Sequence, residues 1–276
     1  MKQKIKLVMS DIDGTILDDN HLVDTKLLSA IQQLKAKKIP FVLSSARSPK
    51  GMYDIAKELD ILDFPIACYN GALILENAEY STSKSIFSHE LAYDEVLLLV
   101  DIIKTTFKAI SINLYSGAEW YVDELDQWAK IESDITKIKP KIQDLQLLLM
   151  EKTLPIHKLL LIGTPQEIRA LKEECEKFHL PTCAFYLSKE NYLEVTNHEV
   201  SKDKALRELA DYYQIPLTAT MAIGDNYNDV PMLLLAGIGV SMGNSPQKVI
   251  ECSDVKTLSN NDHGASRAIL TLIMEE

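Results

Sequence analysis

Short apolar runs alternate with helical patterns of apolar residues in the first part of the chain. The runs predict strands at residues 5–9, 39–43, 65–69 and 72–75. Apolar residues recur at helical spacing after Asp24, a typical helix cap, and after Pro49, which suits a first helical turn. Asn70-Gly71 predicts a tight turn before the fourth strand. This order of strands and helices predicts a parallel sheet with helices on both faces.

The C-terminal part repeats this pattern, whereas the middle of the chain departs from it. Helices are predicted at residues 201–213, 230–236 and 263–273, with strands at 219–223 and 238–240. The middle mixes helices at 94–107 and 166–178 with strands at 109–115, 120–122, 157–162, 182–187 and 192–195. We therefore expect an α/β fold with a doubly wound, parallel-sheet (Rossmann-like) core made of residues 1–82 and 193–276, interrupted by an inserted α+β domain at 83–192.

The composition is that of an acidic, globular protein. Apolar residues make up 46% and charged residues 25%, and 40 Asp and Glu against 29 Lys and Arg give a net charge of −11. A field of this sign disfavours binding to nucleic acid or to an anionic membrane surface, so we expect neither as a partner. No apolar run approaches the ~18 residues of a membrane span.

The sequence favours a cytoplasmic location. Met1-Lys2 begins like a basic signal peptide, but the apolar run that follows is too short and ends at Asp11. The four cysteines form no C-x-x-C pair and have no clustered histidines, as expected for reduced thiols. The sequence does not indicate an oligomeric state.

Four polar segments follow predicted strands or open a predicted helix. They are Asp11-Ile12-Asp13-Gly14-Thr15, Ser44-Ser45-Ala46-Arg47, Lys202, and Gly224-Asp225-Asn226-Tyr227-Asn228-Asp229. Alone, each has an ordinary explanation: a strand exit, a helix cap, a surface lysine in competition with Lys204, and a capped turn. In a doubly wound sheet, however, ligand sites form where the carboxyl ends of the strands meet.

Charge favours a common function for these segments. Asp11, Asp13, Asp225 and Asp229 each bring a negative charge, and a phosphate monoester would add about −2. Carboxylates this close together are costly to keep ionised unless a cation binds. Mg²⁺ suits carboxylate, carbonyl and phosphate oxygens, and Lys202 would add a further positive charge. The four segments together predict a magnesium site that handles phosphate.

The same segments resemble the four motifs of the haloacid dehalogenase superfamily. These motifs are Asp-x-Asp-Gly-Thr, a hydroxyl residue after the second strand, a lysine that opens a late helix, and Gly-Asp-x-x-Asn-Asp. The Asn70-Gly71-Ala72 turn, the distances between motifs and the position of the insertion are similar to those of its Cof-type (subfamily IIB) phosphatases, which carry an α+β cap domain. The resemblance covers essentially the whole chain. The sequence departs from the pattern at Ala46, where the family usually has glycine.

The resemblance implies a Mg²⁺-dependent phosphatase of small phosphate monoesters, such as sugar phosphates, that works through an aspartyl-phosphate. Asp11 is then the nucleophile, and Asp13 is the general acid and base. A carboxylate oxygen of Asp11, the backbone carbonyl of Asp13 and Asp225 would hold Mg²⁺. The cap at 83–192 is expected to contact the leaving group and so to set specificity.

The resemblance also implies which groups hold the phosphoryl group during transfer. They are the Ser45 hydroxyl, the backbone amides of Ile12 and Ala46, and the side chains of Lys202 and Asn228. Asp229 is expected to orient Lys202 or a metal-bound water rather than to bind the metal. The sequence assigns no role to Arg47 or Asn226.

Two other functions stay open. A phosphomutase on the same scaffold would return the phosphoryl group to a substrate hydroxyl, and release of free phosphate would distinguish hydrolysis from it. A non-enzymatic sensor would keep the phosphorylated aspartate, or bind a phosphoester, for signalling. Receiver domains use similar residues, but they are about half this length, and their phosphorylated aspartate does not lie in an Asp-x-Asp motif after the first strand.

Overall fold

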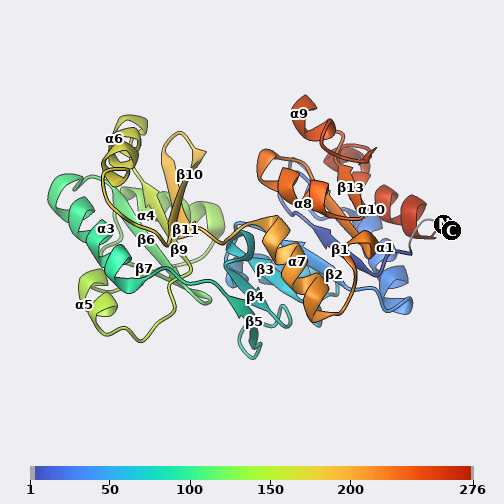
Figure 1. Ribbon diagram of the computed structural model, residues 1–276, viewed down its shortest axis with the longest axis horizontal. Coiled ribbons are helices and arrows are strands. Elements are labelled where there is room, and N and C mark those ends of the chain that lie inside the picture. The colour runs from blue at the N-terminus through green and yellow to red at the C-terminus, as the bar shows by residue number, and fades with distance from the viewer. Residues whose placement is uncertain (1–3, 275–276) are drawn as a thin grey trace. The chain divides into compact units, whose positions relative to one another are not determined.

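The computed structural model describes residues 4–274, which form two compact units (Figure 1). The first unit holds the described residues up to Phe87 and from Ser201 onward, and the second holds Ser88–Val200. The start of the chain at Met1-Lys2, which was compared with a signal peptide, lies outside the described residues. The domain boundaries expected after residues 82 and 192 stay a prediction.

The first unit is built on an eight-stranded sheet in the order β14-β13-β12-β1-β2-β3-β4-β5. Its strands are β1 (Leu7–Ser10), β2 (Phe41–Ser44), β3 (Ile66–Cys68), β4 (Leu73–Leu75), β5 (Ser85–Ser88), β12 (Thr220–Gly224), β13 (Ile238–Ser241) and β14 (Val255–Lys256). From β14 to β3 every pair is parallel, and β4 runs antiparallel to β3. Strand β1 therefore lies between β12 and β2, with all three carboxyl ends at the same edge.

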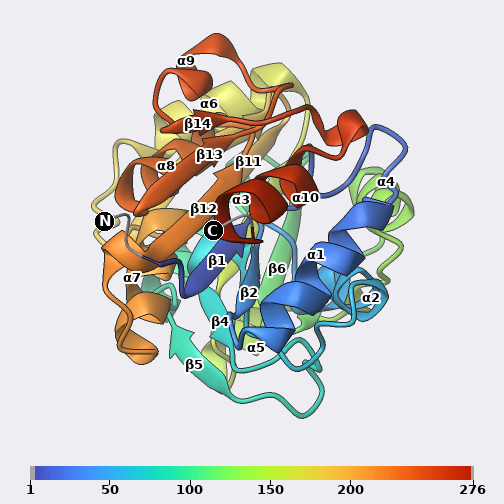
Figure 2. The same cartoon turned by 90° about the vertical axis from the view of Figure 1, so that its right-hand side faces the viewer.

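Helices cover both faces of this sheet. They are α1 (Thr25–Ala36), α2 (Pro49–Glu58), α7 (Lys202–Tyr212), α8 (Val230–Leu235), α9 (Gln247–Ile250) and α10 (Gly264–Ile269), which continues into a π-helical turn at Leu270–Met274. Figure 2 shows α1 packed beside α10 and, on the other side of the sheet, α7 beside α8. The Asp24 side chain caps α1 by accepting from Lys26 N (2.8 Å), and Ser48 caps α2, with Pro49 in its first turn.

The second unit contains a six-stranded sheet in the order β10-β11-β9-β6-β7-β8. Its strands are β6 (Ser111–Ser116), β7 (Glu119–Val122), β8 (Lys141–Ile142), β9 (Lys158–Ile162), β10 (Cys183–Lys189) and β11 (Tyr192–Asn197). Its helices are α3 (Tyr93–Thr106), α4 (Gln127–Thr136), α5 (Leu145–Met150) and α6 (Pro165–Cys175). The strands pair antiparallel, except that β7 and β8 are parallel.

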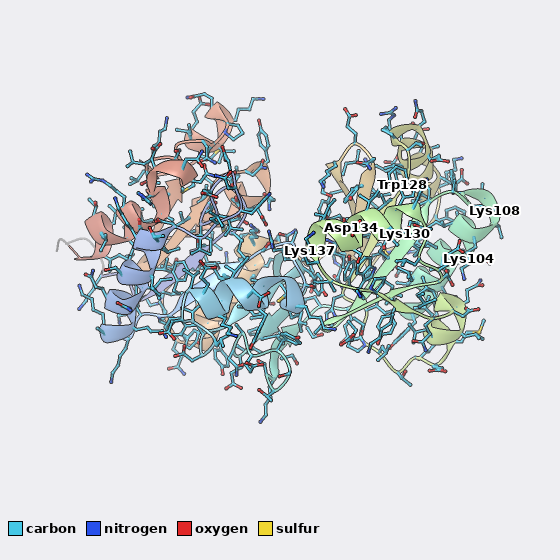
Figure 3. The ribbon with its side chains drawn as sticks, turned by 180° about the vertical axis from the view of Figure 1, so that it is seen from behind. Lys104, Lys108, Trp128, Lys130, Asp134 and Lys137 are labelled. Carbon is cyan, nitrogen blue, oxygen red and sulfur yellow. The ribbon has the colours of Figure 1, made fainter. Side chains whose placement is uncertain are left out.

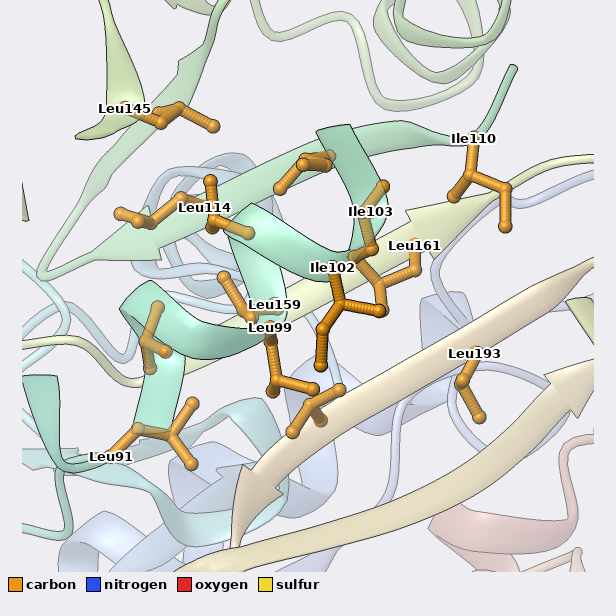
Figure 4. Packing of buried hydrophobic residues seen from close by; sticks show 14 of the residues in the cluster. Leu91, Leu99, Ile102, Ile103, Ile110, Leu114, Leu145, Leu159, Leu161 and Leu193 are labelled. Carbon is orange, nitrogen blue, oxygen red and sulfur yellow. The ribbon is translucent and has the colours of Figure 1, made fainter. Parts of the chain in front are cut away.

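The two faces of this second sheet differ in chemistry. One face carries Leu114 and Leu159, which pack with Leu99 of α3 in the apolar core of the unit (Figure 4). The other face carries a buried ion pair between Lys158 Nζ and Glu194 Oε2 (2.7 Å). Helix α4 is tied to this unit's sheet by a hydrogen bond of 3.0 Å from the Tyr192 hydroxyl to Glu132 Oε2.

The structure confirms the expected fold class of a doubly wound core with an inserted α+β segment. The sequence patterns did not predict α4, α5, α9 or the short strands β5, β8 and β14. Helix α4 was not singled out from the sequence, although its apolar residues Trp128, Ile131 and Ile135 recur at helical spacing. Ile131 and Ile135 are exposed, and the helix buries Ala129 and Glu132 instead. Figure 3 labels Trp128, Lys130 and Asp134 along it. No helix within residues 4–274 is long and apolar enough to span a membrane.

Candidate active site

The polar segments singled out in the sequence begin where the central strands of the first sheet end. Ser10, the last residue of β1, is in register with Ile223 of β12 and Leu43 of β2. Asp11 follows β1 directly, Ser45 follows β2, and Asp225 follows β12. Parallel pairing therefore brings three of the four segments to one edge of the sheet.

Lys202, the first residue of α7, joins two of the aspartates in the interior. Its ammonium group donates a hydrogen bond to Asp11 Oδ1 and another, 2.6 Å long, to Asp229 Oδ1. Only 1% of the Lys202 surface is exposed. Burial acts to lower the pKa of Lys202, but the two carboxylates outweigh it and hold this pKa above its usual range. The anionic neighbour expected for a cation at the start of a helix is therefore present.

Asp229 uses both of its carboxylate oxygens inside the protein. Oδ1 accepts from Lys202, and Oδ2 accepts from the backbone amides of Asp225 and Asn226, both at 2.9 Å. The residue is fully buried within the turn Tyr227–Asp229. This geometry matches an orienting group for Lys202 and fixes the loop that carries Asp225.

Negative charge exceeds positive charge at the centre of the site. Carboxylate oxygens of Asp11, Asp225 and Asp229 all lie within 4.8 Å of one another, with Lys202 as their buried cation. Burial raises the pKa of Asp11 to about 8, and Asp229 and Asp225 add to this effect, while Lys202 opposes it. Burial, followed by Asp229, likewise raises the pKa of Asp225 to about 6. An all-oxygen donor set with this excess of negative charge fits a hard divalent cation.

Gly14 leaves room for the Asp225 carboxylate. The backbone of Gly14 is left-handed (φ +81°), and a Cβ there would lie 2.5 Å from Asp225 Oδ2. The hydroxyl of Thr15, the next residue, donates to Asp225 Oδ1 (3.1 Å). The Asp-Gly-Thr part of the first motif therefore seats the carboxylate that arrives from β12.

Asp13 is held by Arg47 rather than by the buried cluster. The Arg47 guanidinium donates to both carboxylate oxygens of Asp13, from Nε at 2.8 Å and from Nη2 at 2.6 Å. About half of the Asp13 side chain is exposed. No role was assigned to Arg47 from the sequence. Its position as a cation directly after Ser45-Ala46, at the end of a strand, is the sequence feature that could have pointed to the site. A two-point contact of this kind fixes the orientation of a carboxylate.

The remaining predicted residues lie in the loops around this centre. Ser45 is buried, and its backbone amide donates to the carbonyl of Ala67 in β3 (3.0 Å). Ile12 is buried in the loop after Asp11, and Ala46 lies between Ser45 and Arg47. Asn228 is exposed in the turn before Asp229. Lys202 thus contacts Asp11 and Asp229 directly, and the Asp225 carboxylate lies close to both aspartates. Asn228 lies outside this group.

Comparison with known proteins agrees with these features. Residues 8–269 match a family of haloacid dehalogenase-like hydrolases. A Haemophilus influenzae protein named "Putative phosphatase" is 33% identical over 98% of this chain and 97% of its own length. The 5-amino-6-(5-phospho-D-ribitylamino)uracil phosphatase YitU of Bacillus subtilis is 24% identical over 97% of each chain. A crystal structure of a haloacid dehalogenase-like hydrolase from Bacteroides thetaiotaomicron has a TM-score of 0.87 and 27% identity, covering 98% of this chain and 100% of that one.

The family match spans nearly the whole chain and includes all four motif segments. It confirms the resemblance that was drawn from the motifs, and both relatives carry the name of a phosphatase. The chain belongs to the haloacid dehalogenase-like hydrolase family and is a phosphatase of that family.

Proposed function

We propose that the chain hydrolyses small phosphate monoesters with Mg²⁺ through an aspartyl-phosphate. The observation that carries this proposal is the contact between Asp11 and Lys202 beside the carboxylates of Asp225 and Asp229. A carboxylate that lies beside other carboxylates can attack a negatively charged phosphate only when cations compensate the charge of all these groups. The name of the relative YitU gives a small phosphorylated metabolite as its substrate, which supports the same class of substrate here.

In the first step, a carboxylate oxygen of Asp11 attacks phosphorus in line with the leaving oxygen. The bond from phosphorus to that oxygen breaks, and Asp13 donates a proton to the departing alcohol. In the second step, Asp13 takes a proton from a water molecule that attacks the phosphorus. The bond to Asp11 breaks, and inorganic phosphate leaves. Arg47 orients Asp13 for both proton transfers through its two hydrogen bonds.

A carboxylate oxygen of Asp11, the backbone carbonyl of Asp13 and a carboxylate oxygen of Asp225 would hold Mg²⁺. When bound, Mg²⁺ would compensate the charge of Asp11 and of the phosphate oxygens. The residues of this chain would then hold the phosphoryl group through the Ser45 hydroxyl, the amides of Ile12 and Ala46, Lys202 and Asn228. Asp229 keeps the Lys202 ammonium group directed at the site by its 2.6 Å hydrogen bond.

Release of inorganic phosphate from a panel of phosphate monoesters, with Mg²⁺ present, tests this function. Asp11→Asn serves as the blank, because an amide is a poor nucleophile of nearly the same shape. We expect release by the wild type and none above background by the variant. Phosphoryl transfer to an added sugar phosphate without release would show a phosphomutase instead. A stable phosphorylated aspartate that does not turn over would show a sensor.

A further inference from the structure

Three consecutive residues between β3 and β4 have a left-handed backbone. Tyr69, Asn70 and Gly71 have φ values of +53°, +58° and +108°. Positive φ is accessible to glycine and tolerated by asparagine, but it is strained for a bulky residue such as Tyr69, whose side chain is fully buried. Such strain persists only where surrounding contacts determine it. The contacts on the two sides of this turn show what it connects.

On one side, the turn binds the backbone of the loop after β2. The amide of Tyr69 donates to the carbonyl of Arg47 (3.0 Å), and the amide of Asn70 donates to the carbonyl of Ser45 (2.8 Å). Both ends of the Ser45–Arg47 segment are therefore fixed by backbone hydrogen bonds from two residues of the turn. Two adjacent amides of the turn thus reach carbonyls two residues apart in the loop.

On the other side, Gly71 lies against the first turn of α7. A Cβ at Gly71 would be 2.8 Å from the Cβ of Ala205 and 3.3 Å from the carbonyl oxygen of Ser201. That same carbonyl accepts the amide of Ala205 (3.0 Å), so Gly71 contacts the first hydrogen-bonded turn of the helix. Lys202 follows Ser201 in that turn.

We propose that the turn Tyr69–Gly71 is a positioning element that sets the separation between the Ser45–Arg47 loop and Lys202. The inference rests on the proposed function, in which both groups hold the same phosphoryl group. The loop comes from β2 and the lysine from α7, and the turn contacts both through backbone atoms. A side chain at Gly71 would change this separation without removing any group that binds phosphate or metal.

Gly71→Ala tests the proposal. Moving the new Cβ from 2.8 Å to an ordinary contact of 3.4 Å displaces the start of α7 from the turn by about 0.6 Å. We expect kcat to fall about 10- to 100-fold, since misplacements of this size are costly in preorganised sites. The inhibition constant for inorganic phosphate should rise, whereas the Mg²⁺ concentration for half-activation should not change.

Two variants separate this effect from general damage. Gly117→Ala introduces a side chain at another left-handed glycine (φ +55°), in the second unit, where no atom lies within 4 Å of the new Cβ. It should leave kcat and phosphate inhibition unchanged. Ala205→Gly combined with Gly71→Ala removes the Cβ–Cβ contact but leaves the strain of alanine at φ +108°, so it should restore part of the lost turnover. If Gly71→Ala does not fold by circular dichroism, Ala205→Val enlarges the helix side of the same contact and should reproduce the selective loss.

Binding of inorganic phosphate by calorimetry, in the presence of Mg²⁺, supplies a readout that does not depend on turnover. Weaker phosphate binding by folded Gly71→Ala, partly restored in the double variant, supports the positioning role. A folded Gly71→Ala or Ala205→Val protein with wild-type phosphate binding, or a loss that Ala205→Gly does not restore even in part, overturns it. A wild-type protein that binds phosphate but releases none from any monoester refutes the proposed function instead, and leaves the binding comparison valid.

Discussion

Asp11→Asn should affect activity and stability in opposite directions. The variant removes the proposed nucleophile, so turnover should disappear, and more than a few per cent of wild-type turnover would refute that role. It also removes a carboxylate whose pKa burial raises from 3.8 to about 8. Without a bound cation, we therefore expect the variant to be more stable than the wild type at neutral pH.

The sign of this stability effect follows from proton binding. Because the pKa of Asp11 is higher in the folded protein, the unfolded chain loses its proton from about pH 4 upward while the folded protein keeps it to about pH 8. The metal-free fold is therefore destabilised progressively between these values. At pH 7, about 3.2 pH units above 3.8, the penalty amounts to about 4 kcal/mol. Asparagine avoids it but weakens one contact of Lys202, so we expect a net gain of about 1–3 kcal/mol.

Urea unfolding in EDTA at pH 5 and pH 7 measures this gain. The difference in free energy of unfolding between variant and wild type should grow with pH. At pH 5 the pH is only about 1.2 units above the unfolded pKa of Asp11, so only part of the penalty has developed. Asp13→Asn is the matched control, since Asp13 is half-exposed and paired with Arg47, so it should show no gain. A variant less stable than the wild type at pH 7, or a difference that does not change with pH, would refute the reasoning.

Four further results are expected. Asp13→Asn should slow turnover by ~10²–10⁴-fold, and more for alkyl than for aryl phosphates; equal losses on both would contradict its role as the acid. EDTA should abolish turnover, and Mg²⁺ should restore it better than Ca²⁺, which prefers more ligands at longer distances; full activity in EDTA, with no metal found by elemental analysis, would exclude the metal. Burial lowers the pKa of His157 to about 4, so the fold should lose about 3 kcal/mol of stability as pH falls from 6.5 to 4; His157→Gln should remove that part of the pH dependence in urea titrations. Substitution of polar and aromatic residues at 88–200 should change the ratio of kcat/KM between two monoesters without altering Mg²⁺ dependence; a flat ratio throughout would place specificity elsewhere.

Much of the fold was predictable because the elements that position the site have local signals. The strands that became β1, β2 and β12 are short apolar runs, each followed at once by polar residues. Their pairing in parallel follows from the helices between them. The short α5 (Leu145–Met150) was not predictable in this way, because six nearly all-apolar residues show no period, and α4 departs from the usual pattern because its apolar residues Ile131 and Ile135 are exposed.

Side-chain partners in the site were predictable only where charge required them. A lysine at the positive end of a helix needs an anion, and Lys202 does pair with Asp11 and Asp229. The hydrogen bonds from Arg47 to Asp13 had no such requirement, since either residue could have been solvated at a strand end. The left-handed conformation of Tyr69 was also hidden, because a tyrosine gives no sequence signal for positive φ.

The charge balance of the site indicates that these residues serve a ligand rather than the fold. Three carboxylates share one buried lysine, and the raised pKa values of Asp11 and Asp225 show that the protein leaves part of this charge uncompensated. Amide or apolar side chains of similar size would make a metal-free fold more stable. The positive φ of Tyr69 adds a further free-energy cost in the turn that binds the Ser45–Arg47 loop. A bound cation, with an anion that needs it, would offset the cost of the carboxylates, which is the physical reason for expecting Mg²⁺ and a phosphate ester at this edge of the sheet.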